Sequence, residues 1–538
     1  MKPKNIVLLA LVGFVAFLSG GWLLQRSASG GENVYGQARM LDDVVQYVSR
    51  YYVDSLSQSK LYDMAIDGML DQLHDPYTVF LRPKDLKELS LATTGNYGGL
   101  GIRIEVVDGW ITIVSPLPGT PADSAGVQAG DRIVELNGAS THNWSSDTAV
   151  TRLRGPSGSV AHVTIVRPGI ADSIHLAITR EVIHVDPVQF PMVLGHHVGY
   201  VQLNTVSEQS ADELKAAIDS LRQAGARSVI FDLRYNPGGL LNQGIAVSDL
   251  FLNRGEAVVE TRGRAPDASA TYDAEHPQAW PGMPVVVLVN GYTASAAEII
   301  AGALQDHDRA LVLGTTSFGK GLVQSVISIG PDDALKLTTG RWYTPSGRRL
   351  QRPTAHNPAD LGGTIDVNGQ DSTVSDSNPP KFYTDAGRVV YGGGGIKPDV
   401  TVRDTLTTGE QNLLKAIGGK VTVFSGVLSS FALAEKGKRG FTSPNFTVSP
   451  ATIASFRRDL ATRGLTVPDS TWNAGVSWVR DQLGYVIARY AVGRSAEVRR
   501  QIARDAQVQA AIALLAKASS PKQLFTLTEQ TGKTPAPR

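Results

Sequence analysis

No cysteine occurs among the 538 residues of this chain. Its absence excludes disulfide bonds, thiolate nucleophiles, cysteine-ligated zinc and iron–sulfur clusters. The chain also lacks an excess of one charge, because 51 Lys and Arg nearly balance 50 Asp and Glu. We therefore do not expect the net charge of the protein to attract nucleic acid. Any covalent chemistry in this protein has to use an oxygen or nitrogen nucleophile.

The length and composition predict a multidomain globular protein. At roughly 100–200 residues per domain, the chain has room for about three to five domains. Hydrophobic residues make up 42% and charged residues 19%, which suits packed cores and not a disordered chain.

The N-terminus carries the pattern of a membrane segment. Lys2 and Lys4 precede an uncharged run from Ile6 to Leu24. At ~1.5 Å per residue this run reaches ~28 Å, close to the ~30 Å hydrocarbon core of a bilayer. We expect an uncleaved signal-anchor over residues 1–26, with a cleaved signal peptide as the alternative. The positive-inside rule then predicts a single-pass protein of the inner (cytoplasmic) membrane, with the rest of the chain outside the cytoplasm, in the periplasm.

Hydrophobic spacing divides the rest of the chain into four regions. Residues 34–90 show helical spacing and predict a small helical cap, and residues 91–182 hold short strands punctuated by glycine. In residues 183–405, strands alternate with helices, which predicts a sheet covered by helices with the site at strand-to-helix turns. Within it, Ser210 and Glu213 form a capping box expected to open a helix. Residues 352–381 are polar and read as a loop insertion.

Residues 406–538 are expected to be mostly helical and are strongly basic. They hold 18 Lys and Arg against 8 Asp and Glu, a net charge of +10, which leaves −9 for the rest. One interpretation is a solvated basic face that complements the acidic body. The other is contact with an anionic membrane surface or a partner. One helical stripe is predicted from Val498, Ile502, Val508, Ile512 and Leu515.

A glycine turn beginning at Gly98 leads into an alternating strand. Backbone N–H groups in such a turn can form a concave nest for a carboxylate, and the strand can pair with an extended peptide. Downstream, the run from Ser115 to Gly138 resembles the PDZ domain signature, and a helix over 147–153 and a strand over 160–166 complete it. PDZ domains bind free C-termini. The expected peptide-binding residues are Gly98, Gly99, Leu100, Gly101, Ile102, Val150 and Leu153.

Two strand ends carry residues suited to acyl chemistry. A buried strand at Phe231 leads into a tight glycine turn at Gly238 and Gly239. This is either an ordinary strand-to-helix turn or a place where backbone N–H groups form an oxyanion hole. Ser295 stands between a buried strand and a helix. It is either a helix N-cap or a nucleophile whose following N–H, that of Ala296, faces a developing oxyanion.

The segment from Gly314 to Lys320 nearly matches the phosphate-binding loop of nucleotide-binding proteins. The next position should be Ser or Thr but is Gly321, and residues 322–327 resemble a strand and not the required helix. Nucleotide binding is therefore rejected.

A serine hydroxyl needs a base. None of His196, His197 and His307 lies in a recognisable motif for that role. Lysine can serve if desolvation lowers its pKa toward neutrality. Gln324 lies four residues after Lys320, on the same side in a helix or a strand, and its neutral amide could orient the lysine.

Together these residues resemble the C-terminal processing (tail-specific) serine peptidases over about residues 34–405. The resemblance rests on the helical cap, the PDZ insert and four motifs: Asp232-Leu-Arg-x-Asn-Pro-Gly-Gly, Thr293-Ala-Ser-Ala-Ala-Glu, Gly319-Lys-Gly-Leu-Val-Gln and Tyr391-Gly-Gly-Gly-Gly-Ile-Lys-Pro-Asp. It implies a crotonase-like core with a Ser–Lys dyad in which Ser295 is the nucleophile, Lys320 the general base and Gln324 its orienter. The oxyanion donors are expected among Gly238, Gly239 and Ala296.

Two further residues agree with the resemblance and one segment departs from it. Glu298 and Asp306 match family positions and are read as supporting residues. The segment from His74 to Thr78 departs from the family's Leu-Asp-Pro-His-Ser but lies outside the chemistry.

The predicted fold is multidomain α+β: a crotonase-like α/β catalytic core with an inserted, β-barrel-like PDZ domain, an N-terminal helical cap and a helical C-terminal domain. The predicted activity is that of a serine endopeptidase that recognises protein C-terminal tails and cleaves with the Ser–Lys dyad. The expected partners are proteins with flexible tails and the membrane; an adaptor and a homo-oligomer stay open, and no metal, cofactor or nucleic acid is expected. The alternative is a non-catalytic PDZ scaffold that binds tails. A crotonase-like acyl-CoA enzyme conflicts with export and with the PDZ insert.

Overall fold

The computed structural model describes residues 34–352, 379–403, 405–436 and 438–531. The predicted signal-anchor and nearly all of the predicted loop insertion lie outside these residues. The chain forms two compact units, one of Met1–Leu81 with Val326–Leu337 and the other of Arg82–Ser325 with Thr338–Arg538.

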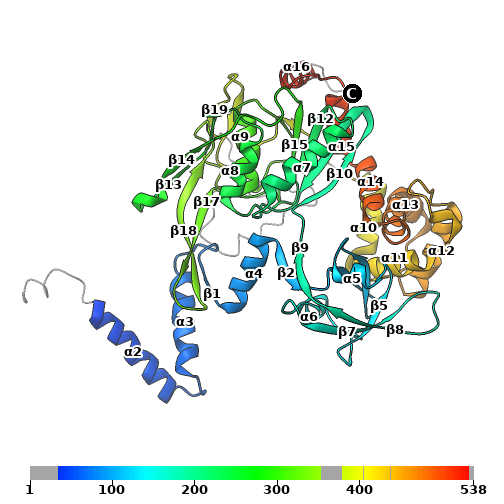
Figure 1. The fold of residues 1–538 in the computed structure, drawn as a ribbon, viewed down its shortest axis with the longest axis horizontal. Helices are drawn as coiled ribbons and strands as arrows, with labels where there is room; N and C mark the ends of the chain where they lie inside the picture. The colour runs from blue at the N-terminus through cyan, green and yellow to red at the C-terminus, as the bar shows by residue number, and fades with distance from the viewer. Residues whose placement is uncertain (1–33, 353–378, 404, 437, 532–538) are drawn as a thin grey trace, which may run out of the picture. The chain divides into compact units, whose positions relative to one another are not determined.

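The first unit is built on two helices. They are α2 (Val34–Tyr51) and α3 (Gln58–Asp71), followed by the short strand β1 (Val79–Leu81), which pairs antiparallel with the start of β18 (Ala334–Tyr343) (Figure 1). Ser57 caps α3 because its side chain accepts a hydrogen bond from the Lys60 N–H. The helical spacing predicted for this region is confirmed.

In the second unit, helix α4 (Pro83–Thr94) leads to a small β domain. Its sheet has the order β3-β4-β5-β7-β8 with β6 paired to β5, so β3 is an edge strand. The predicted helix and strand of this region are present as α6 and β7. The elements are β3 (Ile102–Val107), β4 (Trp110–Pro116), α5 (Pro121–Ser124), β5 (Arg132–Leu136), β6 (Ala139–Ser140), α6 (Ser146–Leu153), β7 (Val160–Val166) and β8 (Ile174–Thr179).

Both chain segments that connect this β domain to the rest of the unit run through one ribbon. Strand β2 (Asn96–Gly99) enters the domain and β9 (Glu181–His184) leaves it. The two strands pair antiparallel, with Asn96 opposite His184. We call β2 and β9 the connecting ribbon.

A six-stranded sheet forms the core of the second unit, in the order β10-β11-β12-β15-β16-β21. The strands from β11 to β21 are parallel, and β10 is antiparallel to β11. Buried side chains alternate between the two faces, which explains why the strands read as continuous apolar runs. The strands are β10 (Val188–Val193), β11 (Val198–Leu203), β12 (Ser228–Asp232), β15 (Val285–Val289), β16 (Leu311–Gly314) and β21 (Val400–Thr401).

Helices cover both faces of this sheet. Phe231 and Val287 pack with α7 (Ser210–Gln223), α8 (Leu241–Asp249) and α9 (Ala296–Asp306) in one core cluster. Ile230 and Val286 pack on the other face with helices from the C-terminal region. The predicted α/β layering is confirmed.

A second sheet and a hairpin complete the region. Strand β13 (Ala257–Gly263) pairs with β14 (Ala270–Asp273) and with the end of β18, and β17 (Leu322–Ser328) also pairs with β18. Strands β19 (Lys381–Tyr383) and β20 (Val389–Tyr391) form the hairpin. Strand β17 follows Lys320, which confirms the strand predicted there. A phosphate-binding loop would be followed by a helix.

The C-terminal region is helical, as predicted. Its first helices form a core cluster that includes Phe431, Phe456 and Leu483 and that Val107 of β3 joins. The helices are α10 (Thr408–Ile417), α11 (Val421–Glu435), α12 (Pro450–Thr462), α13 (Asp469–Ala491), α14 (Arg494–Arg504), α15 (Ala506–Leu515) and α16 (Pro521–Thr531).

One apolar stretch in the described part of the chain, Thr408–Glu435, is long enough to cross a membrane by length and composition. It consists of α10 and α11, separated at Gly418, which has φ +50°. Its apolar side chains Leu413, Phe424 and Phe431 pack in the core of the C-terminal helices. We therefore interpret the stretch as two core helices.

Basic residues of this region pair with acidic residues elsewhere in the same unit. Arg489 contacts Glu105 at 3.3 Å, and Arg463 contacts Asp108 at 3.0 Å. Both acidic residues belong to the β domain. These ion pairs favour the interpretation in which the basic region complements the acidic body.

Two local predictions are wrong. The capping box at Ser210 and Glu213 does not form, because α7 is capped by Gln209 and the Ser210 hydroxyl instead accepts the N–H of Ser207. The single helical stripe from Val498 to Leu515 is shared by two helices, α14 and α15, because Asp505 ends one and caps the other.

Candidate functional site

Ser295 holds a backbone conformation that ordinary helix caps do not adopt. It follows β15 and precedes α9, with φ 55° and ψ −120°. A typical N-cap residue is extended, and a non-glycine residue at positive φ persists only where the surroundings enforce it. The enforcing contacts include the Ala294 N–H, which donates to the Asn236 carbonyl at 2.9 Å. Such strain is typical of a functional position.

The glycine turn after β12 lies directly against the Ser295 segment. A Cβ added at Gly238 would lie 2.6 Å from the Ala294 carbonyl oxygen and 2.8 Å from the Ala296 nitrogen. Gly238 has φ +89°, and a Cβ at Gly239 would lie 2.0 Å from the Val206 carbonyl oxygen. Only glycine permits this approach at both positions.

The expected oxyanion donors differ in their hydrogen bonds. The Gly238 N–H donates to Oδ1 of Asn236 at 2.8 Å. That bond argues against Gly238 as a free donor, and its role is the close approach just described. Asn236 is itself fixed because its Nδ2 donates to the Leu203 carbonyl at 2.8 Å. The sequence alone could not reveal that the side-chain amide of Asn236 accepts the Gly238 N–H.

Glu298 joins the serine turn to the lysine loop. Its Oε2 accepts the backbone N–H of Ser295 and that of Lys320, each at 2.9 Å. Its Oε1 accepts the Gly319 N–H at 2.7 Å and the hydroxyl of Ser317. Glu298 is fully buried. Burial raises the pKa of Glu298, and these four hydrogen bonds oppose that shift.

The lysine loop is fixed by further contacts. The Phe318 N–H donates to the Thr293 carbonyl at 2.9 Å, which is a direct bond between the two loops. The indole of Trp342 donates to the Lys320 carbonyl at 3.0 Å. The backbones at Ser295 and Lys320 are thus held together around the start of α9.

Gln324 lies in β17, where its Nε2 is 3.4 Å from the Thr338 hydroxyl. Its role as orienter of Lys320 stays a prediction. Asp306, read as a supporting residue, pairs with the buried Arg348 and accepts the N–H of Ser346 at 3.0 Å.

Sequence reasoning missed a buried network beside the glycine turn. Arg234 pairs with Asp232 at 2.6 Å and with Asp505 at 2.7 Å. Burial alone would lower the pKa of Arg234, but Asp232 and Asp505 raise it well above the usual range. Tyr200 also donates to Asp232 at 2.8 Å. Arg234 stands in a recognised motif, but no local pattern links it to a residue so distant in the chain.

Two exposed tyrosines near the serine turn were also missed. The rings of Tyr235 and Tyr292 stack with centroids 5.4 Å apart. Both backbone N–H groups donate to Oδ1 of Asn290. The pair offers an apolar surface beside the site.

The β domain has an open pocket between the β3 edge and α6. Of the seven residues expected to bind peptide, the structure places all but Gly98 in its lining. A Cβ at Gly98 would lie 2.2 Å from the Gly155 carbonyl oxygen, so Gly98 permits close packing behind the pocket. Sequence reasoning missed three lining residues: Tyr97, Ile104 and Arg154.

One group of described side chains has the chemistry of metal ligands, and it lies outside the serine site. It consists of His184, Asp186 and Glu213.

Family models match three parts of the chain. The model of peptidase family S41 matches residues 197–357, the PDZ domain model residues 88–166, and the model of the activating protease CtpB N-terminal domain residues 23–84. The expected PDZ domain is thereby confirmed.

Curated relatives carry related names. A "Carboxy-terminal-processing protease" of Bartonella bacilliformis is 39% identical over 350 residues, which cover 63% of this chain and 80% of the relative. "Carboxy-terminal processing protease CtpA" of Bacillus subtilis is 34% identical over 357 residues, covering 65% and 75%. Among solved structures, the photosystem II D1 C-terminal processing protease is 30% identical and covers 62% of this chain and 97% of its own, with a TM-score of 0.33. The resemblance found in the sequence is confirmed.

Proposed function

The chain belongs to the carboxy-terminal-processing proteases of peptidase family S41, and we propose that it cleaves proteins whose C-terminal tails its PDZ domain has captured. The cleavage would use Ser295 and Lys320. The observation that carries this proposal is the shared acceptor Glu298, which holds the backbones of both residues.

Tail capture would occur at the β3 edge. An extended peptide can add a strand there, and the N–H groups of the glycine turn can receive its terminal carboxylate. Leu100, Ile102 and Val150 in the lining favour an apolar last side chain. The tail has to be extended, so flexible C-terminal ends are the proposed substrates.

Cleavage would proceed through an acyl-enzyme. Ser295 Oγ attacks the carbonyl carbon of the scissile bond while Lys320 Nζ accepts the hydroxyl proton, with Gln324 orienting the amine. When the C–N bond breaks, Lys320 returns that proton to the leaving amine. Water then attacks the ester by the same proton path and restores the serine hydroxyl.

The oxyanion formed in each step needs preorganised donors. Because the Gly238 N–H is engaged with Asn236, we assign this role to the N–H groups of Gly239 and Ala296. The stacked tyrosines Tyr235 and Tyr292 would contact substrate side chains next to the scissile bond.

Two broader features belong to the same proposal. The parallel sheet with helices on both faces supports a crotonase-like core. The apolar run from Ile6 to Leu24 supports anchoring in the inner membrane with the site in the periplasm.

A cleavage assay separates this proposal from the tail-binding scaffold. The substrate is a folded reporter with a flexible tail ending in an apolar residue, and the tested proteins are wild type, Ser295→Ala and Lys320→Ala. Ser220→Ala and Lys381→Ala, both at exposed positions, serve as matched controls. We expect cleavage by wild type and controls only, while all five proteins bind the tail. Cleavage that Ser295→Ala leaves unchanged, or tail binding by the wild type without cleavage, would contradict the proposal.

A further inference from the structure

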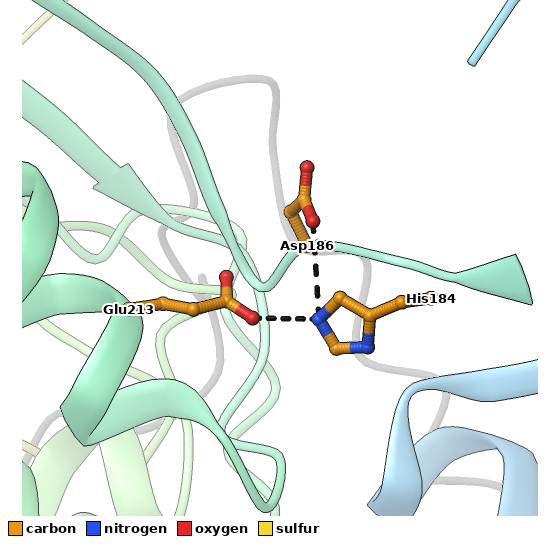
Figure 2. A group of neighbouring side chains, drawn as sticks. All are labelled: His184, Asp186 and Glu213. Carbon is orange, nitrogen blue, oxygen red and sulfur yellow. Dashed lines mark hydrogen bonds and ion pairs between the residues drawn. The ribbon is translucent and has the colours of Figure 1, made fainter. Parts of the chain in front are cut away.

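Three side chains with metal-ligand chemistry converge where the connecting ribbon meets the catalytic region (Figure 2). His184 Nε2 lies 2.6 Å from Oε1 of Glu213 and 3.8 Å from Oδ1 of Asp186. His184 ends β9, Asp186 follows two residues later, and Glu213 reaches across from α7. All three ligand atoms lie within 4.8 Å of one another.

The second ring nitrogen of His184 fixes the tautomer. Nδ1 lies 3.1 Å from Oδ1 of Asn96. The orientation of that amide is set because its Nδ2 donates to the Thr94 carbonyl at 3.2 Å. Oδ1 can only accept, so Nδ1 carries the hydrogen. In the neutral ring the lone pair of Nε2 therefore points at two carboxylates.

A lone pair and a carboxylate oxygen repel each other at 2.6 Å. A proton or a cation has to lie between them. A histidine whose other nitrogen donates to a fixed oxygen is the usual arrangement of a metal ligand.

Glu213 is similarly prepared. Its carboxylate accepts a backbone hydrogen bond from Val188, which holds the side chain in place. Its side chain is only 23% exposed, whereas Asp186 is 74% exposed. The site is thus built on two partly enclosed ligands, with a third at its open side.

We propose that His184 Nε2 and one oxygen each from Asp186 and Glu213 bind a divalent first-row transition metal ion, for which Zn²⁺ is the probe. One imidazole and two carboxylates suit zinc, with water as the fourth ligand. Metal–ligand distances of about 2.0–2.2 Å require ligand atoms roughly 3.3 Å apart. His184 Nε2 lies 2.6 Å from Glu213 Oε1 and 3.8 Å from Asp186 Oδ1, so metal binding requires both carboxylates to rotate.

The ion would join the connecting ribbon to α7. Asn96 and His184 face each other in the ribbon, through which both connections to the PDZ domain pass. Glu213 belongs to a helix packed on the central sheet. Zinc should therefore slow amide hydrogen exchange in residues 96–99 and 181–184. The inference does not depend on the proposed peptidase activity.

The test is zinc titration of the metal-stripped full-length protein in competition with a chromogenic chelator. We expect one equivalent to bind with a dissociation constant in the micromolar range or below. His184→Ala and Glu213→Gln should weaken binding at least about 100-fold, and Asn96→Ala about 10-fold or more. Asp186→Asn should also weaken it, and this exposed position leaves the fold intact.

His276→Ala is the matched control. His276 pairs with Asp249 at 2.6 Å, but the two belong to no three-ligand group in the described part of the chain. This variant should bind zinc as the wild type does. The visible absorption of bound Co²⁺ gives a second readout, which His184→Ala should abolish.

Absence of saturable zinc binding by the wild type would overturn the inference and leave a protonated His184–Glu213 ion pair. Binding that both Asp186→Asn and His184→Ala leave unchanged would overturn it too. Neither readout uses proteolysis, so these failures are distinct from a failure of the proposed function.

Discussion

Ser295 and Lys320 share one hydrogen-bond acceptor, because the backbone N–H of each donates to Oε2 of Glu298 at 2.9 Å. The two residues are 25 positions apart and belong to different loops. A single buried carboxylate therefore sets the relative position of the proposed nucleophile and its base. Removal of its charge should disturb both at once.

We predict that Glu298→Gln lowers kcat/KM on a tailed substrate about 10- to 1,000-fold and costs about 1–3 kcal/mol of unfolding free energy. In the wild type, the donors around Glu298 share the two acceptor oxygens of its carboxylate. Gln offers only one oxygen, and its NH₂ would face backbone N–H donors. Steady-state kinetics and urea unfolding measure the two effects. Glu88→Gln, at an exposed position, should change neither. Wild-type activity in Glu298→Gln would refute the positioning role.

His307 should make stability depend on pH. Burial alone lowers the pKa of His307, but Asp385 and the Ala257 carbonyl, each 2.7 Å from a ring nitrogen, raise it overall. Because the folded pKa is above the unfolded value, this stabilisation is complete below about pH 6.5 and is lost as pH rises through the folded pKa.

The measurement is the unfolding free energy of wild type and His307→Gln between pH 5 and pH 9. The difference should be largest at the acidic end and shrink as pH rises. His162→Gln, at an exposed position, should show no such trend. A difference that grows with pH would mean that the neutral ring is the stabilised form.

Val150→Asp should weaken tail binding about 10- to 100-fold. The residue is half-buried in the lining of the PDZ pocket, so a carboxylate there would meet the apolar last side chain of the tail. Fluorescence anisotropy of a labelled peptide measures the effect. Val160→Asp, on an exposed position of β7 outside this lining, is the control. Equal loss in both variants would indicate a general effect on the PDZ fold.

Asp505→Ala should lower kcat more than it raises KM. Asp505 caps α15 and pairs with Arg234, which stands between Asp232 and the glycine turn. The variant loses both roles. Because Asp505 is partly exposed, we expect its unfolding free energy to fall by only about 1–3 kcal/mol. The exposed pair of Asp469 with Arg457 provides the control, because Asp469→Ala should have little effect. A pure KM effect would contradict a role in positioning the turn.

Local chemistry made much of this protein predictable from its sequence. Strands β7 and β15 begin and end where the apolar runs do. The roles of Ser295 and Lys320 were expected from the family resemblance, because position alone left Ser295 open as a helix N-cap. The PDZ pocket was predictable because the run from Ser115 to Gly138 resembles the PDZ signature, which places the glycine turn and strand before it and the helix after it.

Long-range packing was not predictable. The partner of Arg234 is Asp505, and the second face of the central sheet is covered by α14, α15 and α16. Nothing in the spacing of either segment specifies the other. The capping box failed for a related reason: α7 starts one residue earlier than its pattern suggests, and Glu213 contacts His184 instead.

The central claim is that Lys320 activates Ser295. Its most direct test is the rate of covalent labelling by a serine-reactive fluorophosphonate, followed by intact mass and peptide mapping. We predict one adduct, on Ser295, in the wild type, with a rate at least about 100-fold lower in Lys320→Ala. An adduct on another residue, or a labelling rate that Lys320→Ala leaves unchanged, would contradict the account.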